Sequence, residues 1–185
     1  MRIACSALVK DSGLPDVVDR TAQQHSIEDL PEEAIVFLLA SRYCDTEKLS
    51  QTAWDLFGHT PPGWARVQAV CDFVHNHIKF GYEHASPSKS AFEVWKSRAG
   101  VCRDYAHLMA AFARAASIPA RLVSVYAPRV SPPDFHAVVE VWLAGAWHLV
   151  DATGFAEPEE MARIGVGRDA TDIAFMTVFG TATLI

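Results

Sequence analysis

Several features are missing from this 185-residue sequence, and each absence excludes a class of protein. No apolar run reaches about 18 residues, so we expect no transmembrane helix. The formal net charge of -6 lacks the basic excess that binding to nucleic acid or to an acidic membrane requires. The four cysteines contain no C-x-x-C pair, which indicates neither a zinc ribbon nor a redox dithiol.

Targeting and cofactor motifs are also absent. The start of the chain has one basic residue before a short apolar stretch that ends at Lys10 and Asp11, so we see no signal peptide and expect a cytoplasmic location. The sequence has no D-x-D-x-D-G calcium loop and no phosphate-binding glycine loop. We therefore expect neither a metal nor an organic cofactor. Half of the residues are hydrophobic, which is enough for a sizeable core without disulfides.

The first half of the chain contains mostly helical patterns. Residues 31–40 predict a short helix or an apolar packed segment, and residues 46–57 a helix capped by Asp45 or Thr46. Residues 64–80 have the spacing of an amphipathic helix. Its apolar stripe is formed by Val67, Val70, Cys71, Val74 and Ile78.

A second group of elements follows Ser90, which begins a short helical segment. Residues 101–117 predict a helix that Pro119 ends, and the pattern then changes to that of strands. A short Ala-Gly turn joins the second and third of these strands, as in a hairpin. Helices followed by antiparallel strands indicate an α+β domain. The predicted strands are residues 120–128, 135–144 and 146–153, with candidate outer strands at 3–9 and 171–180.

Cys102 differs from the other cysteines because RAGVCRDYAHLMA, residues 98–110, places it at the start of a helix. Backbone N–H groups in a first helical turn lack internal partners and, with the macrodipole, favour negative charge. A thiolate is the reactive form of cysteine, and the same N–H groups can hold the oxyanion of a tetrahedral intermediate. We therefore expect Cys102 to be a nucleophile, and Cys5, Cys44 and Cys71 not to be.

His136 and Asp151 are candidate partners for this nucleophile. Counting from the hairpin turn puts Leu143 opposite Ala146 and brings His136 close to Gly154. A small register shift or a bulge then places Asp151 diagonally beside His136. The three side chains would act as nucleophile, base and orienter. The alternatives are a surface histidine at a strand start and an aspartate that caps the DATG turn.

Three motifs in this order resemble the papain-like transglutaminase core, in its bacterial transglutaminase-like cysteine protease branch. The resemblance covers roughly residues 30 to 180. It rests on GVCRDYAHL at 100–108, IPARLVSVY at 118–126 and DFHAVVEVWLAGAWHLVDAT at 134–153.

This resemblance implies N-terminal helices and a nucleophile helix packed on an antiparallel β-sheet. It also implies that Cys102 is the nucleophile, His136 the general base and Asp151 the residue that orients the base. Members of this branch often carry a β-rich domain before the core. We therefore assign residues 1–30 to an N-terminal segment, a candidate remnant of such a domain, and residues 31–185 to the catalytic domain.

Three further residues are candidates for substrate binding or for the oxyanion hole. Tyr82 and Trp95 are the aromatic residues just upstream of Cys102, where they either line the cleft or pack in the core. Asp104 complements the helix dipole or binds a substrate amine near the thiol.

The expected reaction is acyl transfer from a peptide or protein amide through a thioester on Cys102. Water as the acceptor makes a peptidase or amidase, which we favour because the resemblance is to the protease-like branch. An amine as the acceptor makes a transglutaminase, and a non-enzymatic peptide-binding or assembly module with the same fold is a further alternative. Transfer from a thioester donor such as coenzyme A is a minor alternative. The sequence does not define the oligomeric state.

Overall fold

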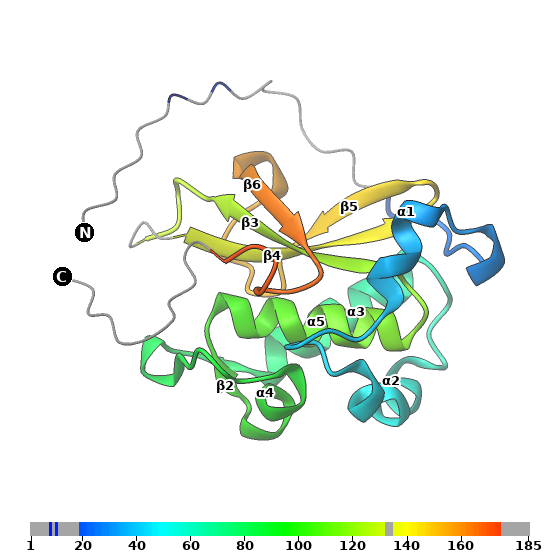
Figure 1. The fold of residues 1–185 in the computed structure, drawn as a ribbon, viewed down its shortest axis with the longest axis horizontal. Helices are drawn as coiled ribbons and strands as arrows, with labels where there is room; N and C mark the ends of the chain where they lie inside the picture. Colours follow the sequence, from blue (N-terminus) through cyan, green and yellow to red (C-terminus); the bar gives the residue numbers. More distant parts are fainter. Residues whose placement is uncertain (1–7, 9, 11–18, 132–134, 175–185) are drawn as a thin grey trace.

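A four-stranded antiparallel sheet in the order β5-β4-β3-β6 forms one layer of the structure, and helices cover one of its faces (Figure 1). The computed structural model describes residues 8, 10, 19–131 and 135–174. The predicted α+β architecture, with the nucleophile helix packed on an antiparallel sheet, is confirmed. The helices are α1 (Glu32–Ile35), α2 (Ser50–Phe57), α3 (Trp64–His77), α4 (Ala91–Ser97) and α5 (Cys102–Ala115). The strands are β1 (Lys79–Phe80), β2 (Ala99–Gly100), β3 (Ala120–Tyr126), β4 (Phe135–Leu143), β5 (Ala146–Val150) and β6 (Ala162–Gly167). Short 3-10 helices are η1 (Ile27–Asp29), η2 (Val36–Leu38), η3 (Thr46–Leu49), η4 (Tyr82–His84) and η5 (Pro158–Glu160).

Helix α5 lies at the centre of the fold. It packs against β3 and β4 on one side and against α2, α3 and α4 on the others (Figure 1). Its residues from Asp104 to Arg114 are all buried, which is the pattern of a helix surrounded by protein. The amphipathic stripe predicted for α3 faces this core, with Val67, Val70 and Val74 buried and Cys71 half-buried.

The helix predicted over residues 46–57 forms as η3 followed by α2, but Asp45 does not cap it. The Asp45 carboxylate instead accepts hydrogen bonds from the Phe92 backbone N–H and the Ser90 hydroxyl, each at 3.0 Å. Both donors belong to the start of α4. The prediction that Asp45 caps this helix was wrong, because the first turn of a helix distant in the sequence lies within reach of its carboxylate.

The predicted hairpin is present, and its register places Leu143 opposite Ala146. Ala144 and Gly145 have φ values of 48° and 81°, as in the type I′ turn that matches the twist of paired strands. Paired residues end at Val139 and Val150, so the chain after Val150 leaves the ladder.

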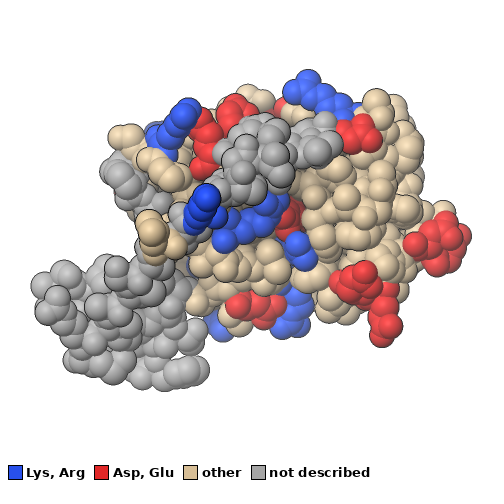
Figure 2. Space-filling view, turned by 90° about the horizontal axis from the view of Figure 1, so that it is seen from above, with Lys and Arg blue, Asp and Glu red and all other residues tan. Residues whose placement is uncertain are grey.

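Strand β6 was not predicted from the sequence. It pairs antiparallel with β3 on the side opposite β4, with an irregularity at Ser124 and Val125. Glu140, which is 1% exposed, joins these strands through ion pairs with Arg121 and Arg163, each at 2.6 Å. Acidic and basic side chains lie interspersed on the face seen in Figure 2.

The part of the N-terminal segment that the structure describes packs against the rest of the domain. The Ala22 carbonyl accepts a hydrogen bond from the Trp64 N–H, and the Gln23 carbonyl accepts one from the Ala144 N–H. The domain boundary proposed at residue 30 stays a prediction. The candidate strand at residues 3–9 and most of that at 171–180 lie outside the described residues. None of the helices in the described ranges has the length and apolar character to cross a membrane.

The turn at Ala144 gives a test of this hairpin. A side chain other than asparagine or glycine is strained at positive φ, so Ala144→Asn should raise the free energy of unfolding by about 1 kcal/mol. For a chain of this size that is a rise in Tm of about 2–4 °C. Ala146→Asn, at the exposed start of β5, is the matched control and should give no gain. A stabilisation of equal size in both variants would contradict the turn geometry.

Candidate active site

Cys102 is the first residue of α5 and is half-buried. Asp104 caps the start of this helix, because its carboxylate accepts a hydrogen bond from the Val101 N–H at 3.0 Å. A Cβ on Gly100 would lie 2.5 Å from that carboxylate, so glycine is required for its close approach. The sequence GVCRD therefore builds the turn that presents the thiol.

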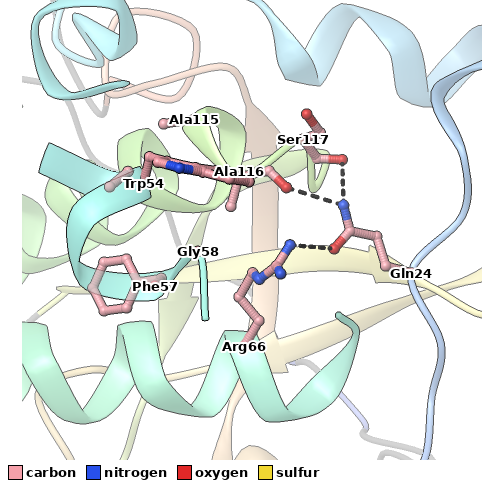
Figure 3. A pocket seen from close by; sticks show the side chains of 9 residues that line it. Gln24, Trp54, Phe57, Gly58, Arg66, Ala115, Ala116 and Ser117 are labelled. Carbon is pink, nitrogen blue, oxygen red and sulfur yellow. Dashed lines mark hydrogen bonds between the residues drawn. The ribbon is translucent and has the colours of Figure 1, made fainter. Parts of the chain in front are cut away.

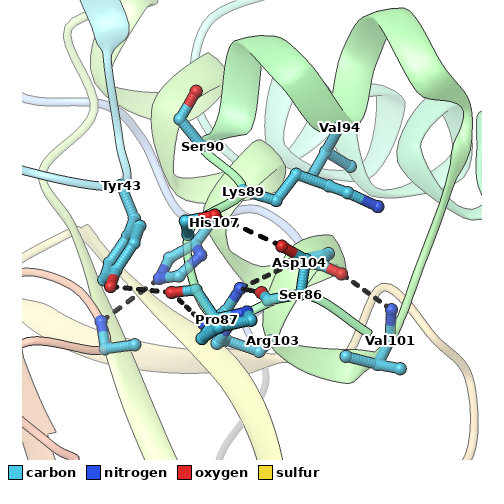
Figure 4. A network of polar contacts seen from close by, with 12 residues as sticks. Tyr43, Ser86, Pro87, Lys89, Ser90, Val94, Val101, Arg103, Asp104 and His107 are labelled. Carbon is cyan, nitrogen blue, oxygen red and sulfur yellow. Dashed lines mark hydrogen bonds and ion pairs between the residues drawn. The ribbon is translucent and has the colours of Figure 1, made fainter. Parts of the chain in front are cut away.

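Arg103 ties the loop before α4 to the start of α5 (Figure 4). Its guanidinium donates hydrogen bonds to the carbonyls of Ser86 and Pro87 and lies 3.3 Å from an Asp104 oxygen. It also lies over the ring of Tyr43, at 5.2 Å from the ring centroid. Arg103 and Asp104 thus fix the two backbone segments that flank Cys102.

His136 and Asp151 form a buried pair at the ends of β4 and β5. His136 Nε2 lies 2.8 Å from Asp151 Oδ2, and the two side chains are 3% and 5% exposed. The imidazole also hydrogen-bonds to the Cys102 side chain. The structure therefore brings all three predicted site residues into one chain of contacts.

Thr153 is a member of this site that sequence analysis missed. The paired residues of β4 and β5 end at Val139 and Val150, and the turn that follows brings the Thr153 hydroxyl within 3.4 Å of His136 Nε2. Asp151 reaches the same nitrogen from this turn, where the chain has already left the ladder, so neither a register shift nor a bulge among the paired residues brings it there. The threonine in HLVDATG, two residues after the aspartate, was the available signal.

Asp151 is held by the turn that follows it. Its Oδ1 accepts hydrogen bonds from the backbone N–H and the hydroxyl of Thr153, at 2.8 and 2.7 Å. Its Oδ2 accepts a longer bond of 3.3 Å from the Ala156 N–H. The capping role considered for Asp151 and its contact with His136 therefore occur together.

The pKa values of the pair are shifted in opposite directions. Burial alone would lower the pKa of His136, but hydrogen bonds and negative charge from Asp151 and Cys102 raise it to about 9. Burial alone would raise the pKa of Asp151, but its bonds with His136 and Thr153 lower it. The imidazolium–carboxylate form is therefore the stable state of the pair near neutral pH.

Helix α3 supports the backbone around Asp151. The Cys71 thiol lies 3.9 Å from the Asp151 carbonyl, and His75 Nδ1 lies 3.1 Å from the Ala152 carbonyl. Burial raises the pKa of the Cys71 thiol to about 12, and that of the fully buried Cys44 thiol to about 11. Both sulfurs are therefore thiols at neutral pH, which is unfavourable for a nucleophile.

The other candidate residues occupy different environments. Tyr82 is 52% exposed and follows β1, which pairs with β2 directly before Cys102. Trp95 is half-buried in α4, stacked on Phe92 at 5.7 Å, and its carbonyl lies 2.8 Å from His77 Nε2. Asp104 is completely buried, and its carboxylate already accepts a hydrogen bond from the Val101 N–H at the start of the helix. Direct substrate binding stays a prediction for all three, and the geometry favours it most for Tyr82.

A pocket of about 160 Å³ lies at the opposite end of α5 (Figure 3). Gln24 crosses it, with its amide bonded to the carbonyls of Ala116 and Ser117 and to Arg66. Its lining includes neither a cysteine nor a carboxylate, and it is separate from the site at Cys102. The residues that line it are Gln24, Ala53, Trp54, Phe57, Gly58, Arg66, Ala115, Ala116 and Ser117.

The family model of the transglutaminase-like superfamily core matches residues 51–152, more than half of the chain. The chain therefore belongs to the transglutaminase-like superfamily. The matched region contains the three site residues, and it confirms the resemblance found in the sequence.

Solved structures agree with this assignment. A candidate cysteine protease from Cytophaga hutchinsonii is 39% identical, with a TM-score of 0.85 over 88% of this chain and 56% of that one. The periplasmic domain of TgpA from Pseudomonas aeruginosa, bound to ethylmercury, is 26% identical, with a TM-score of 0.56 over 72% of this chain and 52% of that one.

The match to a curated protein covers a shorter part of this chain. The uncharacterized protein ML0607 of Mycobacterium leprae is 34% identical over 83 residues, which are 40% of this chain and 30% of that protein. This chain thus spans about half the length of the structural relatives and less than a third of the Mycobacterium leprae protein.

The pair His136–Asp151 gives a test of the site geometry. Asp151→Asn removes the charge that opposes burial, so the pKa of His136 should fall well below about 9, as followed by NMR titration of the imidazole. A His136→Gln variant assigns the signal. Below pH 6.5, the ordinary value of histidine, the wild type has the full stabilisation of the pair, and it loses this as pH rises through about 9. The stability difference between wild type and Asp151→Asn should therefore shrink between pH 6 and pH 10; a constant difference would contradict it.

Proposed function

We propose that this protein is a cysteine peptidase or amidase in which Cys102, His136 and Asp151 act as nucleophile, general acid–base and orienter. The observation that carries the proposal is the contact chain itself. The side chain of Cys102, at a helix start, hydrogen-bonds to the imidazole of His136, and Nε2 of that ring lies 2.8 Å from the buried carboxylate of Asp151. The same arrangement of roles performs acyl transfer on several unrelated folds.

The reaction begins from the ion pair in which the proton of the Cys102 thiol already resides on His136, because the raised pKa of His136 favours the imidazolium near neutral pH. The thiolate sulfur then attacks the amide carbonyl carbon, and the carbonyl electron pair moves onto oxygen. The Asp104 N–H bonds to the Val101 carbonyl, so the donors for that oxyanion are the N–H groups at the very start of α5, those of Cys102 and Arg103. His136 gives its proton to the amine as the C–N bond breaks, which leaves a thioester on Cys102. A water molecule gives one proton to His136 and attacks the thioester carbon; the C–S bond then breaks, which releases the acid and restores the thiolate beside the imidazolium.

Asp151 contributes by fixing the orientation of the ring. Its contact with Nε2 holds the ring in place and stabilises the imidazolium that carries the proton. The raised pKa of His136 keeps the proton available for the leaving amine. Thr153 holds the carboxylate in turn, so the orientation depends on a short local network.

Hydrolysis is favoured over amine transfer because the more similar structural relative is described as a candidate cysteine protease. Transglutaminase activity and a non-catalytic peptide-binding module are the competing functions. The substrate is an amide of a peptide or protein, and no nucleic acid or membrane enters the proposal. The cytoplasmic location stays a prediction, since one relative is a periplasmic domain.

Thiol reactivity tests the nucleophile. Near pH 6, iodoacetamide should alkylate Cys102 faster than Cys44 or Cys71, because the raised pKa values of those two keep them protonated. Peptide mass analysis distinguishes the three in one molecule, so the two buried thiols are internal controls. Equal labelling of the three cysteines, together with the lack of any acyl adduct from a panel of peptide amides, would favour the non-catalytic peptide-binding module.

Product analysis separates the two enzymatic outcomes. With a peptide amide and monodansylcadaverine present together, we expect the free acid as the main product and loss of both products in Cys102→Ala. Dominant incorporation of the amine would instead identify a transglutaminase.

The pH dependence follows from His136. The leaving amine needs a proton from the imidazolium, so kcat/KM should fall as pH rises through about 9, the raised pKa of His136. In Asp151→Asn the alkaline limb should move to lower pH. An alkaline limb that stays in place in this variant would exclude His136 as its source.

A further inference from the structure

Three aromatic rings form a continuous row beside the candidate active site. The rings of Tyr82 and Phe80 meet edge to face with centroids 5.4 Å apart, and those of Phe80 and Phe155 do so at 4.8 Å. The Phe155 ring lies 6.2 Å from the imidazole of His136. We call Tyr82, Phe80 and Phe155 the aromatic ledge.

One end of the ledge lies next to Cys102. In the parallel pair of β1 and β2, Phe80 stands opposite Gly100, and the Gly81 N–H donates to the Gly100 carbonyl at 3.1 Å. Tyr82 follows Phe80 by two residues, as Cys102 follows Gly100. The pairing therefore places η4, which Tyr82 begins, against β2, the strand that leads into α5.

The other end of the ledge lies next to His136. Phe155 follows the turn that holds Asp151, and its backbone N–H donates to the Thr153 hydroxyl at 3.2 Å. The network that orients the imidazole thus also places this ring. A substrate over the sulfur and the imidazole would have the ledge along one side.

The ledge presents apolar surface to solvent. Tyr82 is 52% and Phe155 44% exposed, while Phe80 is half-buried between them. Single exposed apolar side chains are ordinary. Contiguous rings that end at a nucleophile and at its base offer a surface where a side chain of similar size gains both burial and edge-to-face contacts.

We propose that the ledge binds a large apolar side chain, with an aromatic ring preferred, on the acyl side of the amide that Cys102 attacks. This inference rests on the proposed function and adds the substrate class to it. Seating the side chain on Tyr82 and Phe155 positions the adjacent carbonyl at the sulfur. The protein would therefore select peptide amides with Phe, Tyr, Trp or Leu at this position over those with Gly or Ala.

Two alkylating probes with the same reactive group test this preference. N-acetyl-phenylalanyl and N-acetyl-glycyl chloromethyl ketone both alkylate a thiolate by forming a C–S bond as chloride leaves. Labelling of Cys102 is followed by mass, and each rate is divided by the chloroacetamide rate of the same variant. We expect the phenylalanyl probe to be about tenfold faster in the wild type, in the range that apolar subsites give.

Variants locate the preference on the ledge. Tyr82→Ala and Phe155→Ala should each bring the ratio of the two rates close to one. Trp54→Ala is the matched control, because Trp54 is an exposed aromatic residue at the pocket near the other end of α5. It should keep the wild-type ratio. Tyr82→Ala alone decides the test if Phe155→Ala fails to fold.

The outcomes separate this inference from the proposed function. Equal rates for both probes in the wild type, or an unchanged ratio in Tyr82→Ala and Phe155→Ala, would overturn the ledge and leave the nucleophile in place. A Cys102 that reacts with neither probe nor with chloroacetamide would overturn the proposed function, and the ledge inference with it.

Discussion

The burial of α5 between the sheet and the other helices is the constraint on which the rest of the structure depends. A close-packed helix cannot turn or slide without losing contacts on every side. Polar anchors fix both of its ends. In the first turn, the Asp104 carboxylate accepts from the Val101 N–H. In the last turn, the Arg114 guanidinium donates to the carbonyls of Ala120, Leu39 and Arg168. The thiol of Cys102 therefore has a fixed place, and the sheet has only to bring its partners to it.

The sheet does this at a point where its ladder has already ended. His136 lies near the start of β4, and Asp151 lies in the turn just beyond β5. The Asp151 carboxylate accepts hydrogen bonds from the backbone N–H and the hydroxyl of Thr153. Contacts from Cys71 and His75 of α3 reach the carbonyls of that turn. Groups held in place before a reaction need not reorganise during it, which is how protein sites stabilise developing charge.

Much of this architecture could be predicted because the signals are local. The small-residue run after Cys102 predicts a helix, and the Ala-Gly pair between two strand patterns fixes a hairpin and its register. That register predicted His136 and Asp151 to lie near each other only with a small shift or a bulge, whereas the structure brings them together through the turn after β5. Strand β6 could not be found in the same way. Its sequence, ARIGVG, has two glycines, and its pairing with β3 is non-local.

Tertiary contacts account for the remaining differences. Aspartate is a residue type typical of a helix cap, yet the Asp45 carboxylate accepts its hydrogen bonds from the start of α4 and not from the helix that follows it. Thr153 looks like an ordinary turn residue until the folded chain places its hydroxyl beside an imidazole. In both cases the residue type was informative, but the identity of its partner was set by segments distant in the sequence.

The way in which Asp151 is held has a consequence for variation within the superfamily. Apart from the His136 imidazole, its carboxylate takes its donors from Thr153 and Ala156, so its local support lies within six residues of chain. Among the described residues, none from Glu157 onward donates to that carboxylate. Insertions or exchanges there can change the surface beyond the turn while the carboxylate keeps its orientation, which would let one scaffold carry different surfaces around the same pair.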